Sequence, residues 1–358
     1  VDPNWYDQTQ VDALRDDYQA TVLLTKLPSP VKNDELRDAA LTSFFASEIR
    51  NAQFNTEWSG NYSLAHKRLE ALGVPVEKIT GILRNLLGRA PSLQALADDG
   101  EWTTGSSVSM NRERACRVEK SINGTTCTYR LARALQTVDL SNVWRLPNEA
   151  WLLVPGNLVD TVPKNIVTDR TIAKCPDINS FFQRSTGVKI AHRLRRVGID
   201  LQDQGNNQHA CMMAYNQKLA TIDLRNASNS IMLFAAMRTF PEDWSELFEL
   251  LRSPYGSVSK RKDALTGKAE WFEYQMLSSM GNGFTFEAET ALFYAICIAC
   301  GCDYGETWVY GDDIIIPQTK VALVTKVLAI YGLEVNLEKS FTSGAFFESC
   351  GVFSFFGV

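Results

Sequence analysis

Several features that would point to common classes of protein are scarce or missing in this sequence. Only three of its 358 residues are histidine, and they are scattered, so none is assigned to catalysis. The sequence contains no repeat of 20–50 residues and no low-complexity tract. The strongest apolar run, residues 291–300, is shorter than the roughly 20 residues that a membrane-spanning helix needs. We therefore expect no membrane association.

Signals for secretion and for disulfides are also missing. Residues 1–4 are acidic and lack the basic-then-apolar order of a signal peptide. The eight cysteines follow no regular framework, which favours reduced thiols and a cytosolic setting. The chain ends on residues 355–358 (Phe-Phe-Gly-Val), and this apolar end predicts a fragment of a longer reading frame.

The charge balance excludes a histone-like polycation but not a nucleic-acid enzyme. Lys and Arg number 36 against 41 Asp and Glu, a net charge of -5, and 45% of residues are hydrophobic, enough for a large core. Residues 164–196 differ from this average, with eight basic and two acidic residues and a local charge of +6. A solvated helix face explains part of that stretch.

Hydrophobic patterning predicts a mixed α+β fold with helices packed on an antiparallel sheet. The expected helices span residues 34–50, 64–87 (two helices broken at 73–75), 179–197, 285–300, and a helix that Ser228 caps and that runs to residue 239. The expected strands are a buried one at 151–155, an extended stretch at 162–174, and strands at 220–224, 333–336 and 352–356, with a tight hairpin at 307–317.

That hairpin is the strongest local signal for chemistry. Two apolar runs flank the two-residue turn Gly311-Asp312, so the hairpin carries Asp312 and Asp313 at its tip. Adjacent carboxylates repel each other, and a divalent cation would relieve that repulsion. The alternative is an ordinary acidic surface turn.

A third carboxylate, Asp223, lies where an apolar strand ends. It could join Asp312 and Asp313 around two Mg²⁺ ions about 3.5–4 Å apart, the spacing of two-metal nucleotidyl-transfer sites, with Mn²⁺ as a possible substitute. One ion would activate a 3′-hydroxyl and the other would hold the triphosphate. The alternative is an acid that begins a turn or caps a helix.

Cations are expected beside such a site. Lys164 and Arg170 lie six residues apart, so on one strand they would share a face and could grip phosphates. Lys339 follows the strand at 333–336 and could protonate pyrophosphate, although a lone lysine can also serve only at the surface.

Two further stretches have a functional and a structural interpretation. In the loop at 278–285, Gly281 allows a close backbone approach, and Ser279 and Asn282 could contact a ribose or a template backbone, although loops of this composition are common. The loop at 98–109 is rich in Gly, Ser and Thr and precedes Arg112, Arg114 and Arg117, so it could hold phosphate or be a plain surface turn.

Three cysteines form a C-x-x-C-x-C cluster. Cys297, Cys300 and Cys302 could be metal ligands, or small hydrophobic residues on a buried helix. No second pair follows at zinc-ribbon spacing, and the next cysteine, Cys350, is distant in the sequence.

Taken together, these segments resemble the palm of viral RNA-dependent RNA polymerases, and more narrowly the replicase β subunit of positive-strand RNA bacteriophages, the leviviruses. Residues 222–228 resemble motif A, 278–287 motif B, 310–313 (Tyr-Gly-Asp-Asp) motif C, 336–341 motif D and 347–351 motif E, while 162–170 and 199–204 resemble the phage form of motif F and its sequel. Five ordered motifs are more specific than one tetrapeptide.

The resemblance implies a right-hand polymerase: an N-terminal and fingers region at 1–160, a basic fingers segment at 161–208, a palm at 209–343, and motif E with a truncated thumb at 344–358. It implies primer-independent RNA synthesis in the cytoplasm of an infected bacterium, with host elongation factors Tu and Ts and a host ribosomal protein as partners. Asn229 departs from the acid expected in motif A, and Glu289 stands where many animal-virus polymerases have Asn.

The leading hypothesis is therefore template-directed RNA synthesis from NTPs by two-metal-ion catalysis. Asp223 and Asp312 ligate Mg²⁺, Asp313 is a weaker or water-mediated ligand, and Ser228 joins the nucleotide contacts. A reverse transcriptase is the alternative with the same chemistry, and a preference for dNTPs would favour it. A catalytically idle RNA-binding or assembly module is the alternative from another class.

Overall fold

The fold centres on a four-stranded antiparallel sheet that carries the candidate catalytic residues. The computed structural model describes residues 2–27, 33–60, 63–141, 143, 151–259 and 269–358. The strands of this central sheet are β5 (Leu219–Arg225), β8 (Trp308–Tyr310), β9 (Asp313–Pro317) and β10 (Glu334–Val335), in the order β10-β5-β9-β8. Every neighbouring pair is antiparallel, as the sequence predicts.

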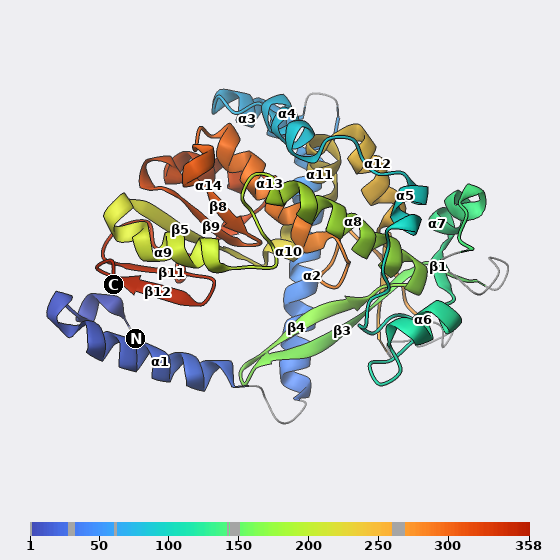
Figure 1. Cartoon of the computed structure of the whole chain (residues 1–358), viewed down its shortest axis with the longest axis horizontal. Coiled ribbons are helices and arrows are strands. Elements are labelled where there is room, and N and C mark those ends of the chain that lie inside the picture. The colour runs from blue at the N-terminus through green and yellow to red at the C-terminus, as the bar shows by residue number, and fades with distance from the viewer. Residues whose placement is uncertain (1, 28–32, 61–62, 142, 144–150, 260–268) are drawn as a thin grey trace.

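Both faces of the central sheet are covered, which explains its long apolar runs. Ile222 and Ile314 point into the main core with α13 (Thr285–Ala299) and α14 (Val321–Ile330). Leu219 and Ile315 point the other way, into a second cluster with α9 (Gly205–Gln217) and the hairpin of β11 (Phe346–Ser349) and β12 (Val352–Phe355). Figure 1 shows the helices above and below these strands. The predicted α+β class, with helices on an antiparallel sheet, is confirmed.

A second sheet carries the basic segment. Its strands are β3 (Gly156–Asn165), β4 (Thr168–Lys174), β6 (Tyr255–Val258) and β7 (Phe272–Glu273), in the order β4-β3-β6-β7. Strands β3 and β4 form a long hairpin, and α2 (Asp34–Glu57) packs along it (Figure 1). The hairpin runs from the side of β1 past α2 (Figure 1), and residues at its tip line the candidate site.

The remaining helices pack around these two sheets. Helix α8 (Asp177–Arg195) lies beside α13, and α4 (Val76–Leu87) packs against both of these helices. The others are α1 (Val11–Lys26), α3 (Leu64–Ala71), α5 (Leu93–Asp98), α6 (Arg117–Asn123), α7 (Tyr129–Ala134), α10 (Ala227–Ser230), α11 (Leu233–Thr239) and α12 (Glu242–Leu251). Within the described chain, none of the helices is both long enough and apolar enough to cross a bilayer.

Three local predictions are wrong. The helix after β5 is not capped by Ser228: Asn226 precedes it, Ser228 lies inside it, and the Ser228 hydroxyl donates to Glu289. This helix ends at Ser230, and α11 starts only at Leu233. Strand β2 (Leu152–Val154) is not buried, since Leu152 is 61% exposed, and it pairs with the short β1 (Thr126–Thr128). Residues 162–174 form a hairpin rather than one extended strand.

Candidate active site

A cavity of about 690 Å³ opens where the two sheets meet. It is bounded by the end of β5, the β8–β9 turn, the tip of the β3–β4 hairpin, α10 and the segment after β10. Six residues selected from the sequence line it: Lys164, Arg170, Asp223, Ser228, Asp312 and Lys339. These six residues come from four separate stretches of chain that meet in one place.

The register of β5 against β9 brings the acids together. Asp223 is the direct cross-strand partner of Asp313, across ninety positions of sequence. Directly opposed residues in an antiparallel pair have Cβ atoms about 4.5–5.5 Å apart. Asp312 precedes Asp313 in the turn and lines the same cavity as Asp223. The fold therefore brings Asp223 and Asp312 to one cavity, with Asp313 beside Asp223 on the paired strand.

The β8–β9 turn requires glycine at its first position. Gly311 has a φ of +60°, and a Cβ there would lie 2.3 Å from the ring of Phe286. Its amide donates a hydrogen bond to the Thr290 hydroxyl at 3.0 Å, which ties the turn to α13. The turn is thus held on a buried helix, and Asp312 is presented from a fixed position.

Asp223 is held by the segment that follows β10. The Asn336 side-chain amide donates to its carboxylate at 2.8 Å, and the Asn336 backbone amide donates to its carbonyl at 2.8 Å. The Asp223 amide in turn donates to the Ser340 hydroxyl at 3.0 Å. Asn336 was missed as a site residue, although it stands three positions before Lys339 in the same predicted segment.

Asp313 is oriented differently. Its carboxylate accepts hydrogen bonds from the Ser349 hydroxyl at 3.2 Å and from the Cys350 amide at 3.3 Å, both in the β11–β12 turn. It is not among the residues that line the cavity. Two of the three acids, Asp223 and Asp312, therefore line the cavity and are called the cavity pair below. The third, Asp313, is hydrogen-bonded to the β11–β12 turn instead.

Burial and mutual repulsion make these carboxylates costly to ionise. Burial raises the pKa of Asp312, and the charge of Asp313 raises it further. Burial also raises the pKa of Asp223, with a smaller contribution from Asp312, while the Asn336 hydrogen bond lowers it. The pKa of Asp313 is raised mainly by burial and also by Asp223. A bound cation would stabilise the charged forms.

The cavity pair suits a hard divalent cation in donor chemistry, because carboxylate oxygens and water are the ligands that Mg²⁺ prefers. It also fits in charge, because burial and, to a smaller extent, neighbouring acids raise the pKa of both carboxyls, and a bound cation would stabilise their charged forms. Among the residues that the structure describes, no three His, Cys, Asp or Glu side chains are grouped closely enough to hold a metal ion. Further ligands would have to come from water or substrate.

The three cations that were selected from the sequence share the cavity lining with the acids. Lys164 and Arg170 come from opposite strands of the β3–β4 hairpin, not from one face of a single strand, and Lys339 follows β10. Partial burial lowers the pKa of Lys164, and Arg170 and Lys339 lower it further, whereas Asp312 and Asp223 act in the opposite direction. The cavity lining thus combines these cations with the acids.

A buried acid sits beside Ser228. The Ser228 hydroxyl donates to the Glu289 carboxyl at 2.8 Å, and both residues line the cavity. Glu289 is 2% exposed, and burial raises its pKa well above the usual range. Asn229 also lines the cavity, and its side-chain oxygen is buried without a hydrogen-bond partner. The sequence signal for Glu289 was an acid inside a strongly apolar helix.

The 278–285 loop does not bring its three selected residues to the cavity. The Asn282 side-chain oxygen accepts from the Phe284 amide at 3.0 Å, which fixes the start of α13. A Cβ on Gly281 would lie 2.4 Å from the Ala173 carbonyl of β4. Ser279 is buried and accepts from the Asn157 side chain at 3.4 Å. Only Met280 of this loop lines the cavity.

The cysteine cluster belongs to the main core. Cys297, Cys300 and Cys302 are all buried among its apolar side chains. Burial raises the pKa of Cys300 to about 12, so the thiol rather than the thiolate is favoured. Their burial in the core supports the interpretation of the three cysteines as small hydrophobic residues rather than as metal ligands.

Fold and site together define an α+β protein whose central hairpin presents acids to a cavity lined by cations. A family model described as "RNA replicase, beta-chain" matches residues 6–358, and the chain belongs to this family. It is 34% identical to the "RNA-directed RNA polymerase beta chain" of Enterobacteria phage fr and 33% identical to that of Escherichia phage MS2. Each match covers 100% of this chain and 65% of the relative, so the chain spans less than two thirds of their length.

The chain is also similar to a solved structure titled "RdRp complex". The TM-score is 0.49 with 9% sequence identity, and the match covers 84% of this chain and 29% of that one.

Proposed function

We propose that this chain carries the catalytic centre of an RNA-directed RNA polymerase that copies a phage RNA genome from NTPs. The single observation that carries the proposal is the β5–β9 register. It supports a site in which Asp223 and Asp312 face Lys164 and Arg170 across one cavity. Family membership supports the same function, since the curated relatives bear this activity in their names.

Asp223 and Asp312 would hold Mg²⁺, two ions in our proposal, with Mn²⁺ as a possible substitute. When bound, such ions lower the pKa of an attacking hydroxyl and neutralise charge on the phosphates. Asp313 would act as a weaker or water-mediated ligand, which is consistent with the hydrogen bonds it accepts from the β11–β12 turn. Asn336 would keep the Asp223 carboxylate in one orientation.

The cations would bind and orient the other substrate groups. Lys164 and Arg170, at the tip of a hairpin braced by α2, would hold the triphosphate of the incoming nucleotide. Lys339 would donate a proton to the departing pyrophosphate. Ser228, bonded to Glu289, would contact the nucleotide sugar.

The loop residues keep a supporting role in this proposal. Ser279, Gly281 and Asn282 would act on the nucleotide through the loop that they stabilise, since Met280 of that loop faces the cavity. Gly281 is the least replaceable of them because it combines a φ of +106° with close contact to β4.

The wider assignments are proposals as well. Residues 1–160 and 161–208 would form the fingers, 209–343 the palm, and 344–358 motif E and the start of a thumb. RNA would be both template and product. Host elongation factors Tu and Ts and a host ribosomal protein would be partners in the cytoplasm of the infected bacterium; the resemblance to the phage replicases supports this.

The decisive test is Asp312→Asn. RNA synthesis on a single-stranded template with Mg²⁺ is expected to fall by at least about 100-fold, since a charge that neutralises the developing transition state is lost. Asp303→Asn is the matched control, because Asp303 is an exposed acid on the same approach to β8. Near-wild-type turnover in Asp312→Asn would refute the assignment. If the wild-type chain binds RNA but shows no Mg²⁺-dependent release of pyrophosphate, the catalytically idle RNA-binding module is supported. A preference for dNTPs over NTPs would support the reverse transcriptase.

A further inference from the structure

A second cavity, of about 570 Å³, lies away from the candidate active site. It is lined by the loop around residues 107–114, by the connection from α6 to β1, and by the base of the β3–β4 hairpin. This volume falls in the range of small-molecule sites, about 300–1,000 Å³. This loop is the one that, from its Gly, Ser and Thr content and the arginines after it, could hold phosphate or be a plain surface turn.

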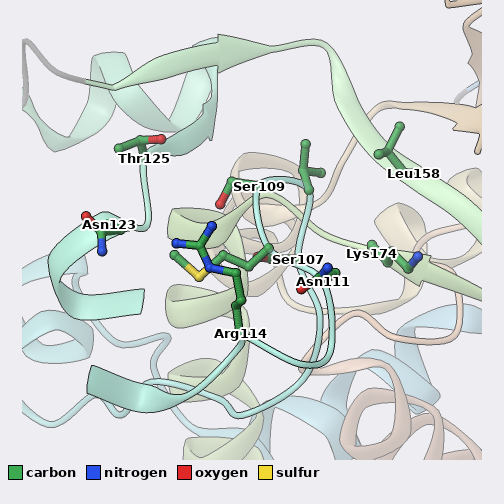
Figure 2. A pocket seen from close by; sticks show the side chains of 10 residues that line it. Ser107, Ser109, Asn111, Arg114, Asn123, Thr125, Leu158 and Lys174 are labelled. Atoms are coloured by element: carbon green, nitrogen blue, oxygen red, sulfur yellow. The ribbon is translucent and has the colours of Figure 1, made fainter. Parts of the chain in front are cut away.

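The lining is made of hydrogen-bonding groups and two cations. Figure 2 shows the Arg114 guanidinium reaching toward the middle of the pocket, between Asn123 and Ser109, with Lys174 on the opposite side. No acidic residue is among those that line it within the described chain. Each cation has one carboxylate partner outside the lining: Glu119 for Arg114 at 3.1 Å and Asp160 for Lys174 at 2.7 Å. A phosphate could therefore share these cations, as surface ion pairs are weak.

One lining residue is an unsatisfied polar group. Ser107 is 3% exposed, and its hydroxyl is buried with no hydrogen-bond partner. Buried hydroxyl groups in proteins are nearly always bonded, so an unpaired one needs an explanation. A ligand oxygen in the pocket supplies one.

The loop that holds these groups is fixed in place. The Ser107 amide donates to the Met110 carbonyl at 2.9 Å, and the Val108 amide donates to the Cys175 carbonyl, just after β4, at 3.1 Å. The Ser109 hydroxyl donates to the buried Asp177 carboxylate at 2.7 Å. The pocket is thus formed by anchored elements, so little ordering is needed on binding.

The strand β4 connects this pocket with the candidate active site. Arg170 and Lys174 are four residues apart, so their side chains share one face of the strand, about 13 Å apart at roughly 3.3 Å per residue. Arg170 lines the active-site cavity and Lys174 lines this pocket. A single strand of RNA that touched both cavities would follow this face of β4.

We propose that the pocket binds one nucleotide unit of single-stranded RNA, with Arg114 and Lys174 on its phosphate and Ser107 on a sugar or phosphate oxygen. Phosphate contacts by Arg and Lys, together with hydroxyl and amide contacts to the rest of the nucleotide, are how proteins hold single-stranded RNA. The identification of RNA as the ligand rests on the proposed function. The evidence that the pocket is a binding site comes from its lining and is independent of that function.

The test measures RNA binding without catalysis. A fluorescent 12-nucleotide RNA is titrated with the whole chain in EDTA and without NTPs, and anisotropy is recorded at several salt concentrations. Arg114→Ala is expected to weaken binding about 3- to 10-fold and to reduce the slope of log K against log salt by about 0.7, the value for one phosphate contact on a single strand. Arg112→Ala is the matched control, since Arg112 is exposed in the same loop but does not line the pocket.

A second measurement uses the wild-type chain and so does not depend on a variant folding. RNA containing 4-thiouridine is crosslinked by light, and crosslinked peptides from residues 107–125 are expected. Equal RNA affinity in the Arg114 and Arg112 variants, or crosslinks only elsewhere, would overturn the proposal. ATP binding that depends on Arg114 while RNA affinity does not would also overturn it and identify a free nucleotide as the occupant.

Failure of this inference and failure of the proposed function can be distinguished. Arg114→Ala is expected to weaken RNA binding by the same factor in the Asp312→Asn background as in the wild type, because Asp312 does not line the pocket. A chain that makes no RNA but binds it through Arg114 keeps this inference and loses the proposed polymerase activity. If the chain makes RNA and neither RNA synthesis nor RNA binding depends on Arg114, the proposed polymerase activity is kept and this inference is lost.

Discussion

At the scale of single residues, Glu289 has the least expected environment. Its position in an apolar helix is visible in the sequence, but its hydrogen bond with Ser228 and its place in the cavity lining come from contacts across 61 positions. Burial raises its pKa well above the usual range. At neutral pH, ionising Glu289 therefore opposes folding.

This predicts a pH-dependent effect of Glu289→Gln. A carboxyl whose pKa is raised on folding reduces stability as the pH rises from its ordinary value, about 4.3, through the raised value. The neutral Gln avoids that loss and can still accept from Ser228. The melting temperature of the variant minus that of the wild type is expected to grow by about 2 °C or more between pH 5 and pH 8.

Glu306→Gln, at an exposed position, is the control for that measurement. A difference between Glu289→Gln and wild type that stays constant from pH 5 to pH 8 would contradict the prediction.

The acids themselves could be predicted from sequence, but not how they are held. Asp312 is recognisable because glycine precedes it between two apolar runs, and Asp223 because it ends a strand. The donors that orient them, Asn336 for Asp223 and Ser349 for Asp313, are set by tertiary contacts. A single sequence contains no local pattern for such pairs.

At the scale of elements, the β8–β9 and β3–β4 hairpins show when a turn can be predicted from the sequence. The β8–β9 turn contains Gly-Asp, a strong turn signal, and was predicted correctly. The β3–β4 turn runs through Ile166 and Val167, which favour strands, so the sequence indicated one extended segment. The side chain of Asn165 closes that turn by accepting from the Val167 amide at 3.0 Å.

Gly311→Ala tests the β8–β9 turn as a unit. The positive φ and the close Phe286 ring both oppose a Cβ, so we expect a loss of about 2–4 kcal/mol in unfolding free energy. Denaturant unfolding measures it. Gly105→Ala is the control, because Gly105 has an ordinary φ and no atom lies within 4 Å of the place that its new methyl group would take, and about 0.5 kcal/mol or less is expected. Equal losses in the two variants would show that the turn does not need glycine.

At the scale of the whole molecule, the α+β class follows from the alternation of apolar helices and strands, but the arrangement does not. Strand β9 pairs with β5 across ninety positions, and α2 packs along a hairpin more than one hundred positions away. Such pairings depend on which buried faces complement each other, and periodicity within a segment does not encode that choice.

A global measurement should detect the cation that the cavity pair would bind. Mg²⁺ that binds only the folded chain adds about 1.4 kcal/mol at ten times its dissociation constant, which we expect to appear as a rise of about 2 °C in melting temperature. Asp223→Asn should lose most of this rise, and Asp303→Asn should keep it. The same rise in the Asp223 variant would exclude Asp223 as a ligand. This readout is independent of catalysis.

The pairing of β5 with β9 also limits how the length of this chain can vary. Adding or deleting one residue between Leu219 and Asp223 would turn every later side chain of β5 to the opposite face of the sheet. Asp223 would then point into the apolar side under α13, and its place would be taken by Ile222 after an insertion or by Leu224 after a deletion. Insertions and deletions inherited by related genes should therefore fall outside these strands, while single substitutions can accumulate within them.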